Sequence, residues 1–341
     1  MVRVHRWAGN GLMPLGNPYR ALLGAAGGGA TAETLVGGDG GFIVTTESAD
    51  YSTGWTDRNT AAGASTTGIT GTAVGASSRM LAVGASGYIR TSTDGGAVWT
   101  DRSSAAGTGA NTIYGSAIGP SGVMLAVGAT GYIRTSTDDG GTWTDRNTAA
   151  GASSNLIHGC AVGPTNQMLA VGYVGYIRTS TDGGATWVDR NTASGASSTH
   201  VFGCAIGPSG EMIAVGQSGY IRTSTDGGGT WVDRNSAAGS PSIYMYQPAI
   251  GPSGEMLAVG GNSYIYTSTN GGAAWTDRST ASGIGGNDAY GCTIGPTGQM
   301  LALGAAGWIR ASTDGGGTWA DINSAAGAGS TILRAASTGP A

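Results

Sequence analysis

Short apolar runs alternate with glycine-rich turns along almost the whole chain. Runs such as "IHGCAVG" (157–163), "MLAVG" (168–172) and "YIRTST" (176–181) are rich in β-branched and aromatic residues and are separated by Gly, Pro, Asn or Asp. Such runs between turn-forming residues predict short β-strands. No stretch shows the apolar spacing of a helix of any length, so the chain is expected to be all-β.

The same pattern returns every 44 residues. Equally spaced tryptophans mark it at Trp55, Trp99, Trp143, Trp187, Trp231, Trp275 and Trp319. Each unit contains four predicted strands, which in one unit are residues 157–163, 168–172, 176–181 and 186–191; we call their equivalents strands A, B, C and D. Units of about 40–45 residues with four strands form the blades of β-propellers, which close with roughly four to eight blades.

The two ends of the repeat region each supply part of one blade. The tail "TILRAASTGPA" (331–341) repeats strand A and its Gly-Pro turn, and the segment before Trp55 supplies strands B, C and D. Pairing these pieces completes a blade and removes exposed edge strands. Residues 22–30 are an alternative for strand A, although they lack the Gly-Pro turn. We therefore predict a seven-bladed β-propeller over residues 33–341, closed by pairing of N- and C-terminal strands, after an N-terminal extension at 1–32.

The segment S-T-D-x-G-x-T-W recurs at the end of strand C. It occupies Ser92–Trp99, Ser136–Trp143, Ser180–Trp187, Ser224–Trp231 and Ser312–Trp319, with Asn270 replacing Asp in a sixth copy and a degenerate first copy at 47–55. The segment resembles the Asp-box, or BNR repeat, of β-propeller proteins. We expect a structural role, in which the Asp carboxylate accepts backbone N–H groups of its own turn, the glycines allow positive φ, and the Trp packs between strands.

An arginine on strand C is predicted to face an aspartate on strand D. Counting back across the hairpin pairs Arg90 with Asp101, Arg134 with Asp145, Arg178 with Asp189, Arg222 with Asp233, and Arg310 with Asp321. Cross-strand ion pairs of this kind stabilise a sheet by about 0.2–1 kcal/mol each. A ring of anion-binding arginines is the alternative.

Sequence variation is concentrated in the D-to-A connections and the B-to-C turns. In a blade of alternating strands these two connections lie on the same face of the ring. Positions 12, 13 and 15 after each Trp vary, and position 15 is the most suggestive: Thr70, Tyr114, His158, Phe202, Tyr246, Tyr290 and Arg334. Exposed aromatic rings at the channel mouth suit contacts with sugars or protein side chains. Candidate ligand-binding residues are therefore Tyr114, His158, Phe202, Tyr246 and Tyr290; drift in exposed loops is the alternative.

Composition excludes several classes of ligand. The net charge is −4 and all sixteen basic residues are Arg, which argues against nucleic acid or anionic membranes as partners. No apolar run reaches 18 residues, so no membrane-spanning helix is expected. Cys160, Cys204 and Cys292 share one small-residue position in three units, which predicts buried free thiols rather than disulfides or metal ligands. We expect no metal and no cofactor.

Catalysis is not expected. The BNR name is met most often in sialidases, and that resemblance would imply three carboxylate-binding arginines, a Tyr nucleophile with a Glu partner, and an Asp acid. The chain has only four Glu, and Glu211 and Glu255 belong to Gly-Pro turns on the face away from the variable loops. No Ser/His/Asp set or metal-ligand spacing accompanies His158 and His200. We therefore predict no catalytic residues; a sialidase-like glycoside hydrolase is the alternative.

Asp-box propellers also occur in photosystem II assembly factors, secreted carbohydrate-binding proteins and phage tail fibres. The near-identical units and the absence of Lys make this chain resemble the phage-encoded type. That resemblance implies a virion component, a tail fibre or decoration protein with a glycan or protein receptor; a secreted or cell-surface protein and an assembly factor are alternatives. In the extension, Arg6, Trp7, Tyr19 and Arg20 are candidates for attachment to other virion or assembly proteins, unless the arm lies on the propeller itself.

Overall fold

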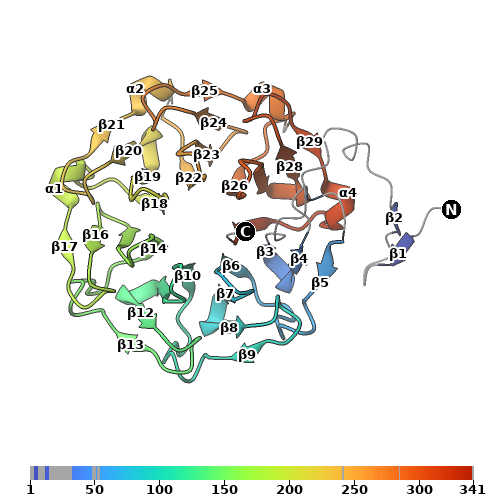
Figure 1. Ribbon diagram of the computed structural model, residues 1–341, viewed down its shortest axis with the longest axis horizontal. Helices are drawn as coiled ribbons and strands as arrows, with labels where there is room; N and C mark the ends of the chain where they lie inside the picture. The colour runs from blue at the N-terminus through green and yellow to red at the C-terminus, as the bar shows by residue number, and fades with distance from the viewer. Residues whose placement is uncertain are drawn as a thin grey trace.

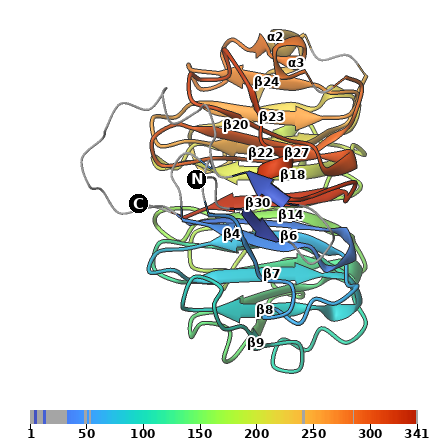
Figure 2. The same ribbon diagram turned by 90° about the vertical axis from the view of Figure 1, so that its right-hand side faces the viewer.

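Seven four-stranded antiparallel sheets form a closed ring in the computed structural model (Figure 1). The structure describes residues 33–47, 51, 54–239, 242–283 and 285–339, together with the backbone of 4–6 and 12–14. In the side views the strands of a blade succeed one another outwards from the axis, as β6, β7, β8 and β9 do in Figure 2. The predicted all-β, seven-bladed propeller is confirmed.

Each blade uses its strands in a fixed order from the axis outwards. The innermost strands are β6 (Ile69–Val74), β10 (Ile113–Ile118), β14 (Ile157–Val162), β18 (Val201–Ile206), β22 (Met245–Ile250), β26 (Ala289–Ile294) and β30 (Leu333–Thr338). The second strands are β3 (Thr34–Gly38), β7 (Met80–Gly84), β11 (Met124–Gly128), β15 (Met168–Gly172), β19 (Met212–Gly216), β23 (Met256–Gly260) and β27 (Met300–Gly304).

The outer half of each blade is shorter. The third strands are β4 (Ile43–Thr46), β8 (Ile89–Ser92), β12 (Ile133–Ser136), β16 (Ile177–Ser180), β20 (Ile221–Ser224), β24 (Ile265–Ser268) and β28 (Ile309–Ser312). The outermost strands have two residues each: β5 (Thr56–Asp57), β9 (Thr100–Asp101), β13 (Thr144–Asp145), β17 (Val188–Asp189), β21 (Val232–Asp233), β25 (Thr276–Asp277) and β29 (Ala320–Asp321). Edge strands this short offer little template for pairing with another chain.

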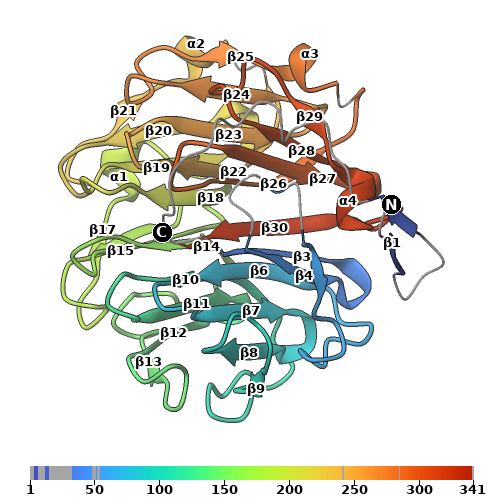
Figure 3. The same ribbon diagram turned by 45° about the vertical axis from the view of Figure 1, so that its right-hand side comes forward.

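Strands from opposite ends of the chain close the ring. β30 pairs antiparallel with β3, placing Ser337 opposite Leu35 and Ala336 opposite Val36. The hydroxyl oxygens of Thr34 and Thr338 lie 3.0 Å apart in this seam. Figure 3 shows the C-terminal β30 beside β3, and the prediction of closure by both ends is therefore confirmed. The alternative strand at 22–30 lies outside the described residues.

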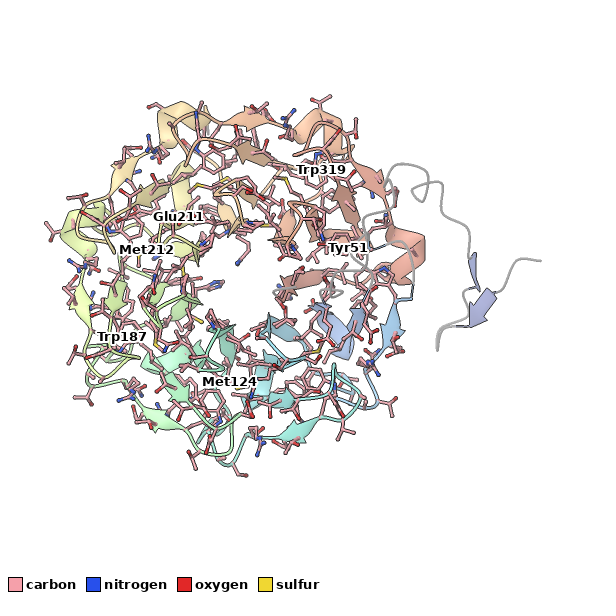
Figure 4. The ribbon with its side chains drawn as sticks, in the orientation of Figure 1. Tyr51, Met124, Trp187, Glu211, Met212 and Trp319 are labelled. Carbon is pink, nitrogen blue, oxygen red and sulfur yellow. The ribbon has the colours of Figure 1, made fainter. Side chains whose placement is uncertain are left out.

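The hydrophobic core lies between neighbouring blades, where side chains such as Met124 pack (Figure 4). All five residues of β7, β11, β15, β19, β23 and β27 are buried, since a blade stands against each face of these strands. One cluster joins Leu35 and Ile43 of one blade to Met80, Tyr88 and Trp99 of the next. Burial on both faces explains why the second strand reads "MLAVG" and not as alternating apolar and polar residues.

Four one-turn helices lie in the connections between outer and inner strands, where no helix was expected. They are α1 (Asn191–Ser194), α2 (Asn235–Ala238), α3 (Ser279–Ser282) and α4 (Asn323–Ala326). Each ends at a glycine in the left-handed region, as at Gly195 with φ 63°. A single turn leaves no room for an amphipathic repeat, so apolar spacing could not reveal these helices.

The Ser-Thr-Asp turns are held by their own side chains. In one of them Asp138 Oδ1 accepts hydrogen bonds from the Thr142 N–H and the Ser136 hydroxyl, both at 2.8 Å. The indole N–H of Trp143 donates to the carbonyl of Gly140 at 3.0 Å. These contacts lower the pKa of Asp138 to about 2, chiefly through the hydrogen bonds from Thr142. The expected structural role of the aspartate is therefore seen in its contacts.

The predicted cross-strand pairs are confirmed. Arg178 lies opposite Asp189 in the register of β16 and β17, and the two side chains form an ion pair at 2.9 Å. The Arg178 guanidinium also lies 4.6 Å from the ring centroid of Tyr176. Equivalent ion pairs form at Arg90–Asp101, Arg134–Asp145, Arg222–Asp233 and Arg310–Asp321. These arginines therefore have a structural partner, which weakens the alternative of a free anion-binding ring.

A separate two-stranded hairpin lies outside the ring. It consists of β1 (Val4–Arg6) and β2 (Leu12–Pro14), and β2 contacts α4 (Figure 1). The side chain of Arg6, and the whole of Trp7, Tyr19 and Arg20, lie outside the described residues, so the predicted attachment residues stay a prediction. No helix in the described part of the chain is both long and apolar enough to cross a membrane.

Candidate functional site

A β-bulge occurs at position 15 of every innermost strand. In β10, Ile113 pairs with Gly128 and Gly115 pairs with Val127, which leaves Tyr114 as the extra residue. The same shift surrounds His158, Phe202, Tyr246 and Tyr290 in their strands. A bulge bends its strand and re-aims the extra side chain. Each variable residue is therefore presented by a backbone feature that all blades share.

The bulge residues line one cavity at the mouth of the central channel. The cavity has a volume of about 220 Å³, and its rim is formed by Thr70, Tyr114, His158, Phe202, Tyr246, Tyr290 and Arg334. Glycines and small residues form the wall below the rim, among them Gly115, Ser116, Gly159, Cys160 and Cys204. The structure thus brings the five candidate aromatic residues together around one opening.

These five side chains form a continuous series of ring contacts, which we call the aromatic arc: Tyr114, His158, Phe202, Tyr246 and Tyr290. The Tyr114 and His158 rings stack, with centroids 5.2 Å apart and planes 9° apart. Beyond them the rings are inclined, because His158 and Phe202 meet at 72° and Tyr246 and Tyr290 at 46°. The arc therefore has a stacked half, Tyr114 and His158, and an inclined half in which the ring planes of Phe202, Tyr246 and Tyr290 are tilted relative to their neighbours.

Three further aromatic residues lie against the arc. Tyr173, in the B-to-C turn of its blade, stacks on His200 with centroids 4.3 Å apart, and it lies 6.1 Å from His158. His200 Nδ1 accepts the N–H of Val174 at 3.1 Å. Tyr244 is 47% exposed and lies 5.8 Å from Phe202. Tyr244 was missed because position 13 carries a different residue in every unit, His200 and Asp288 among them, so only its neighbours in space reveal its place.

The rim residue Arg334 forms a charged pair that joins the first and last parts of the chain. Arg334 donates from Nε to Asp39 Oδ1 at 2.6 Å and from Nη2 to Asp39 Oδ2 at 2.8 Å. Its guanidinium also lies 5.9 Å from the ring centroid of Tyr290. The hydrogen bonds to Asp39 raise the pKa of Arg334, which therefore stays charged.

His158 and the cysteines of the channel wall are not activated groups. Burial lowers the pKa of His158, so the neutral imidazole is favoured, and the ring contacts the Phe202 carbonyl through Nδ1 at 3.1 Å. Burial also raises the pKa of the thiols of Cys160, Cys204 and Cys292. The thiols are free, as predicted, although Cys160 is only half-buried because it lines the channel. A thiol in this protonated state is a poor nucleophile.

The opposite mouth of the channel has a different character. Its lining comes from the Gly-Pro turns and the ends of the inner strands, including Val74, Ile118, Val162 and Ile206. Within the described residues, no group of three or more His, Cys, Asp or Glu side chains could hold a metal ion. Aromatic and charged groups of the channel therefore gather at the mouth that carries the variable loops.

Comparisons with known proteins support the fold. No protein-family model matches the chain, and neither does any curated protein. Among solved structures, YCF48 from Cyanidioschyzon merolae is similar with a TM-score of 0.54 and 18% identity, over 75% of this chain and 84% of that one. A structure described as YCF48 bound to D1 peptide gives a TM-score of 0.60 and 16% identity, over 80% and 85%.

An enzyme shares the same architecture. An ancestral GH74 enzyme is similar with a TM-score of 0.56 and 16% identity, over 74% of this chain but only 38% of its own. At such low identities the likeness concerns the fold alone, and the same fold carries unrelated functions. The chain is therefore a seven-bladed β-propeller whose structural neighbours include both a peptide-bound protein and an enzyme.

Proposed function

We propose that this protein is a non-catalytic binding propeller that receives part of a protein or glycan at the aromatic arc. One observation carries the proposal: five consecutive blades place a ring at the same bulge position, around one cavity. The surrounding framework repeats from blade to blade, whereas these side chains differ. Concave sites lined by aromatic rings with a few polar groups are typical of ligand recognition.

Ring orientation supports a small protruding group as the ligand. Tyr114 and His158 each cover one face of the other, so we expect this half of the arc to contact a ligand chiefly through its polar edges. Tyr246 and Tyr290 meet at 46° and offer inclined apolar walls. The similar structure of YCF48 is described with a bound D1 peptide, which supports a protein ligand for a propeller of this shape.

The chemistry of the cavity supports binding without catalysis. Glycoside hydrolysis uses two carboxyl groups that face each other across the substrate. The described residues lining this cavity include no Asp or Glu, and its thiols are held protonated by burial. The likeness to an ancestral GH74 enzyme keeps a glycoside hydrolase as the alternative. A panel of fluorogenic glycosides and sialosides distinguishes the two, and turnover abolished by substitutions in the arc would overturn the proposal.

The setting we propose is a phage particle, with the chain acting as a tail-fibre or decoration protein. The repeated Ser-Thr-Asp turns resemble Asp-boxes, and the nearly identical lysine-free units resemble phage-encoded propellers. We assign attachment to the N-terminal extension; the contact of its strand β2 with α4 of the ring is what the alternative, an arm lying on the propeller itself, predicts. Mass spectrometry of purified virions tests this location, and deletion of residues 2–20 tests attachment; detection only in a host assembly complex would favour an assembly factor.

Binding at the arc is tested with glycan and peptide arrays. The unmodified protein is compared with Tyr246→Ala and Tyr290→Ala, each checked by thermal melting. Val98→Ala is the matched control, because Val98 is 65% exposed in a Ser-Thr-Asp turn on the opposite face. We expect the two tyrosine variants to lose binding by about tenfold or more. Equal binding by all four proteins would refute a ligand site at the arc.

A further inference from the structure

Three tyrosines cluster at the inclined end of the aromatic arc: Tyr246 and Tyr290 of the arc, and the neighbouring Tyr244. Tyr246 lies 5.2 Å from Tyr290 and 6.5 Å from Tyr244 between ring centroids, with planes 46° and 62° apart. Phe202 packs against Tyr244 at 70°. Rings at such angles do not stack face to face, so each leaves part of its face uncovered by the others. We call Tyr244, Tyr246 and Tyr290 the tyrosine box.

A carboxylate is fixed at the edge of this box. Asp288 Oδ2 accepts the hydroxyl of Tyr290 at 3.2 Å, and Asp288 Oδ1 accepts the N–H of Asn262 at 2.9 Å. Both contacts hold the side chain in place without neutralising it. None of the ion pairs formed by the described residues includes Asp288. The tyrosine box therefore lies beside one negative charge that forms none of these ion pairs.

The carboxylate of Asp288 affects the pKa of the hydroxyl groups of Tyr246 and Tyr290. Burial and then Asp288 raise the pKa of the Tyr246 hydroxyl to about 12, and the same two causes raise the pKa of Tyr290. The guanidinium of Arg334, which lies near Tyr290, is already held by two hydrogen bonds to Asp39. Arg334 also lies 5.9 Å from the Tyr290 centroid, so this ring already accepts a guanidinium on one side.

We propose that the tyrosine box with Asp288 is a site for a cationic side chain, the ammonium of Lys or the guanidinium of Arg, on a protein ligand. The proposal rests on the proposed function, since it names the group that the arc receives. Aromatic faces attract cations within about 6 Å of the ring centroid, and a carboxylate beside them adds a direct ionic partner. In the stacked half, each of Tyr114 and His158 covers one face of the other, and none of the contacts of the described residues places a carboxylate beside these two rings.

The experiment compares cations with neutral molecules of the same shape. Choline is titrated against its neutral isostere 3,3-dimethylbutanol, and a short Gly/Ser peptide with one Lys is titrated against the same peptide with norleucine or Glu. Binding is followed by calorimetry and by NMR shifts of the tyrosine rings. We expect choline and the Lys peptide to bind about tenfold or more tightly than the neutral probes. This comparison uses the unmodified protein and therefore does not depend on any variant folding.

Variants then locate the site. Asp288→Asn is expected to weaken binding of the Lys peptide about tenfold, whereas Glu211→Gln removes one charge on the opposite face and leaves binding unchanged. Tyr246→Phe keeps the aromatic face and should retain binding that Tyr246→Ala loses. Equal affinity for charged and neutral probes, or no effect of Asp288→Asn, overturns the cation site but leaves the arc as a binding surface.

Failure of the cation site alone can be distinguished from failure of both proposals. If glycans or apolar peptides bind at the arc and cationic probes do not, the proposed function stands and the cation site is wrong. If neither the probes nor the arrays produce binding that depends on Tyr246 or Tyr290, the proposed function fails together with the inference.

Discussion

Arg334 on the last strand donates two hydrogen bonds to Asp39, 295 residues earlier in the chain. Asp39 belongs to the turn η2 (Asp39–Gly41), which connects β3 to β4. The pair lies above the seam where β30 and β3 close the ring, and Arg334 itself also lines the cavity. The same contact therefore joins the closure of the fold to its candidate binding site.

The contribution of this pair to ring closure is measurable. Both side chains are 38% exposed, so their coupling energy in a double-mutant cycle of Asp39→Ala and Arg334→Ala is expected at about 0.2–1 kcal/mol. Denaturant unfolding of the four proteins gives this value. The equivalent cycle at Arg178 and Asp189 provides a comparison within one blade. A coupling energy indistinguishable from zero would show that the backbone pairing of β30 and β3 closes the ring alone.

Acid should weaken the Ser-Thr-Asp turns. The hydrogen bonds from Thr186 and then Ser180 lower the pKa of Asp182 to about 2, from an ordinary value near 4. Because this pKa is lower in the folded protein than in the unfolded chain, ionised Asp182 stabilises the fold above about pH 4. That contribution is lost as the pH falls from about 4 through about 2. Thermal melts across that range should show a steep loss of stability that is smaller in Asp182→Asn.

Asparagine is the matched replacement for that test because one blade already uses it. Asn270 Oδ1 accepts the N–H of Ala274 at 2.8 Å, as the aspartates of the other turns accept the equivalent N–H. Asp182→Asn should therefore retain the hydrogen bond and the fold at neutral pH. It should lose the part of the pH dependence of stability that comes from protonation of Asp182. A pH profile identical to that of the unmodified protein would contradict the assignment to Asp182.

Glycine is required at Gly175 for two reasons that can be separated. Gly175 has φ 71°, and a Cβ there would overlap the carbonyl oxygen of Ser197. Gly183 has a similar φ of 69°, but a Cβ there would meet no atom within 4 Å. Gly183→Ala should lower the free energy of unfolding by about 1 kcal/mol through backbone strain, and Gly175→Ala should lower it by clearly more. Denaturant unfolding measures both values. Equal costs would mean that the turn near Ser197 moves to accommodate the methyl group.

Val174 is a strained residue on the variable face. It has φ 54° and is 61% exposed, although β-branched residues rarely adopt this conformation. The equivalent residues include Gly40, Ser86 and Asn262, which tolerate it better. Val174→Asn is therefore expected to raise the free energy of unfolding by about 1 kcal/mol. Reduced ligand binding by the stabilised variant would indicate that the strained turn beside His200 serves recognition; unchanged stability would show that the strain is relieved elsewhere.

The fold was predicted in detail because its signals are local and repeated. The 44-residue period gave the blades, the run "MLAVG" marked the fully buried strand, and hairpin counting placed Arg178 opposite Asp189. Closure of the ring could also be predicted from the sequence, because the tail around Ala336 repeats the first strand of a unit. Each of these inferences needs only strand length, turn chemistry and antiparallel pairing.

The site was predicted only in part. The variable position 15 identified Tyr114, His158, Phe202, Tyr246 and Tyr290, but nothing in the pattern showed how these rings meet. The bulge had a signal that was not used, because a glycine such as Gly115 inside a strand often marks one. Tyr244 and Asp288 both occupy position 13 of their units, which was recognised as variable, but no two units share a residue there, so comparison among units did not connect them to the arc.

The sequence by itself determined the number of blades, their strand order and the residues at which the ring closes. It did so because turns and β-strands form from neighbouring residues, and a repeat shows the same local choice seven times. Only the tertiary structure decided which ring faces are covered, which carboxylate stands beside the tyrosine box, and that Asp39 meets Arg334. Those relationships join residues from different blades, and their geometry depends on bulges and blade angles that no local pattern encodes.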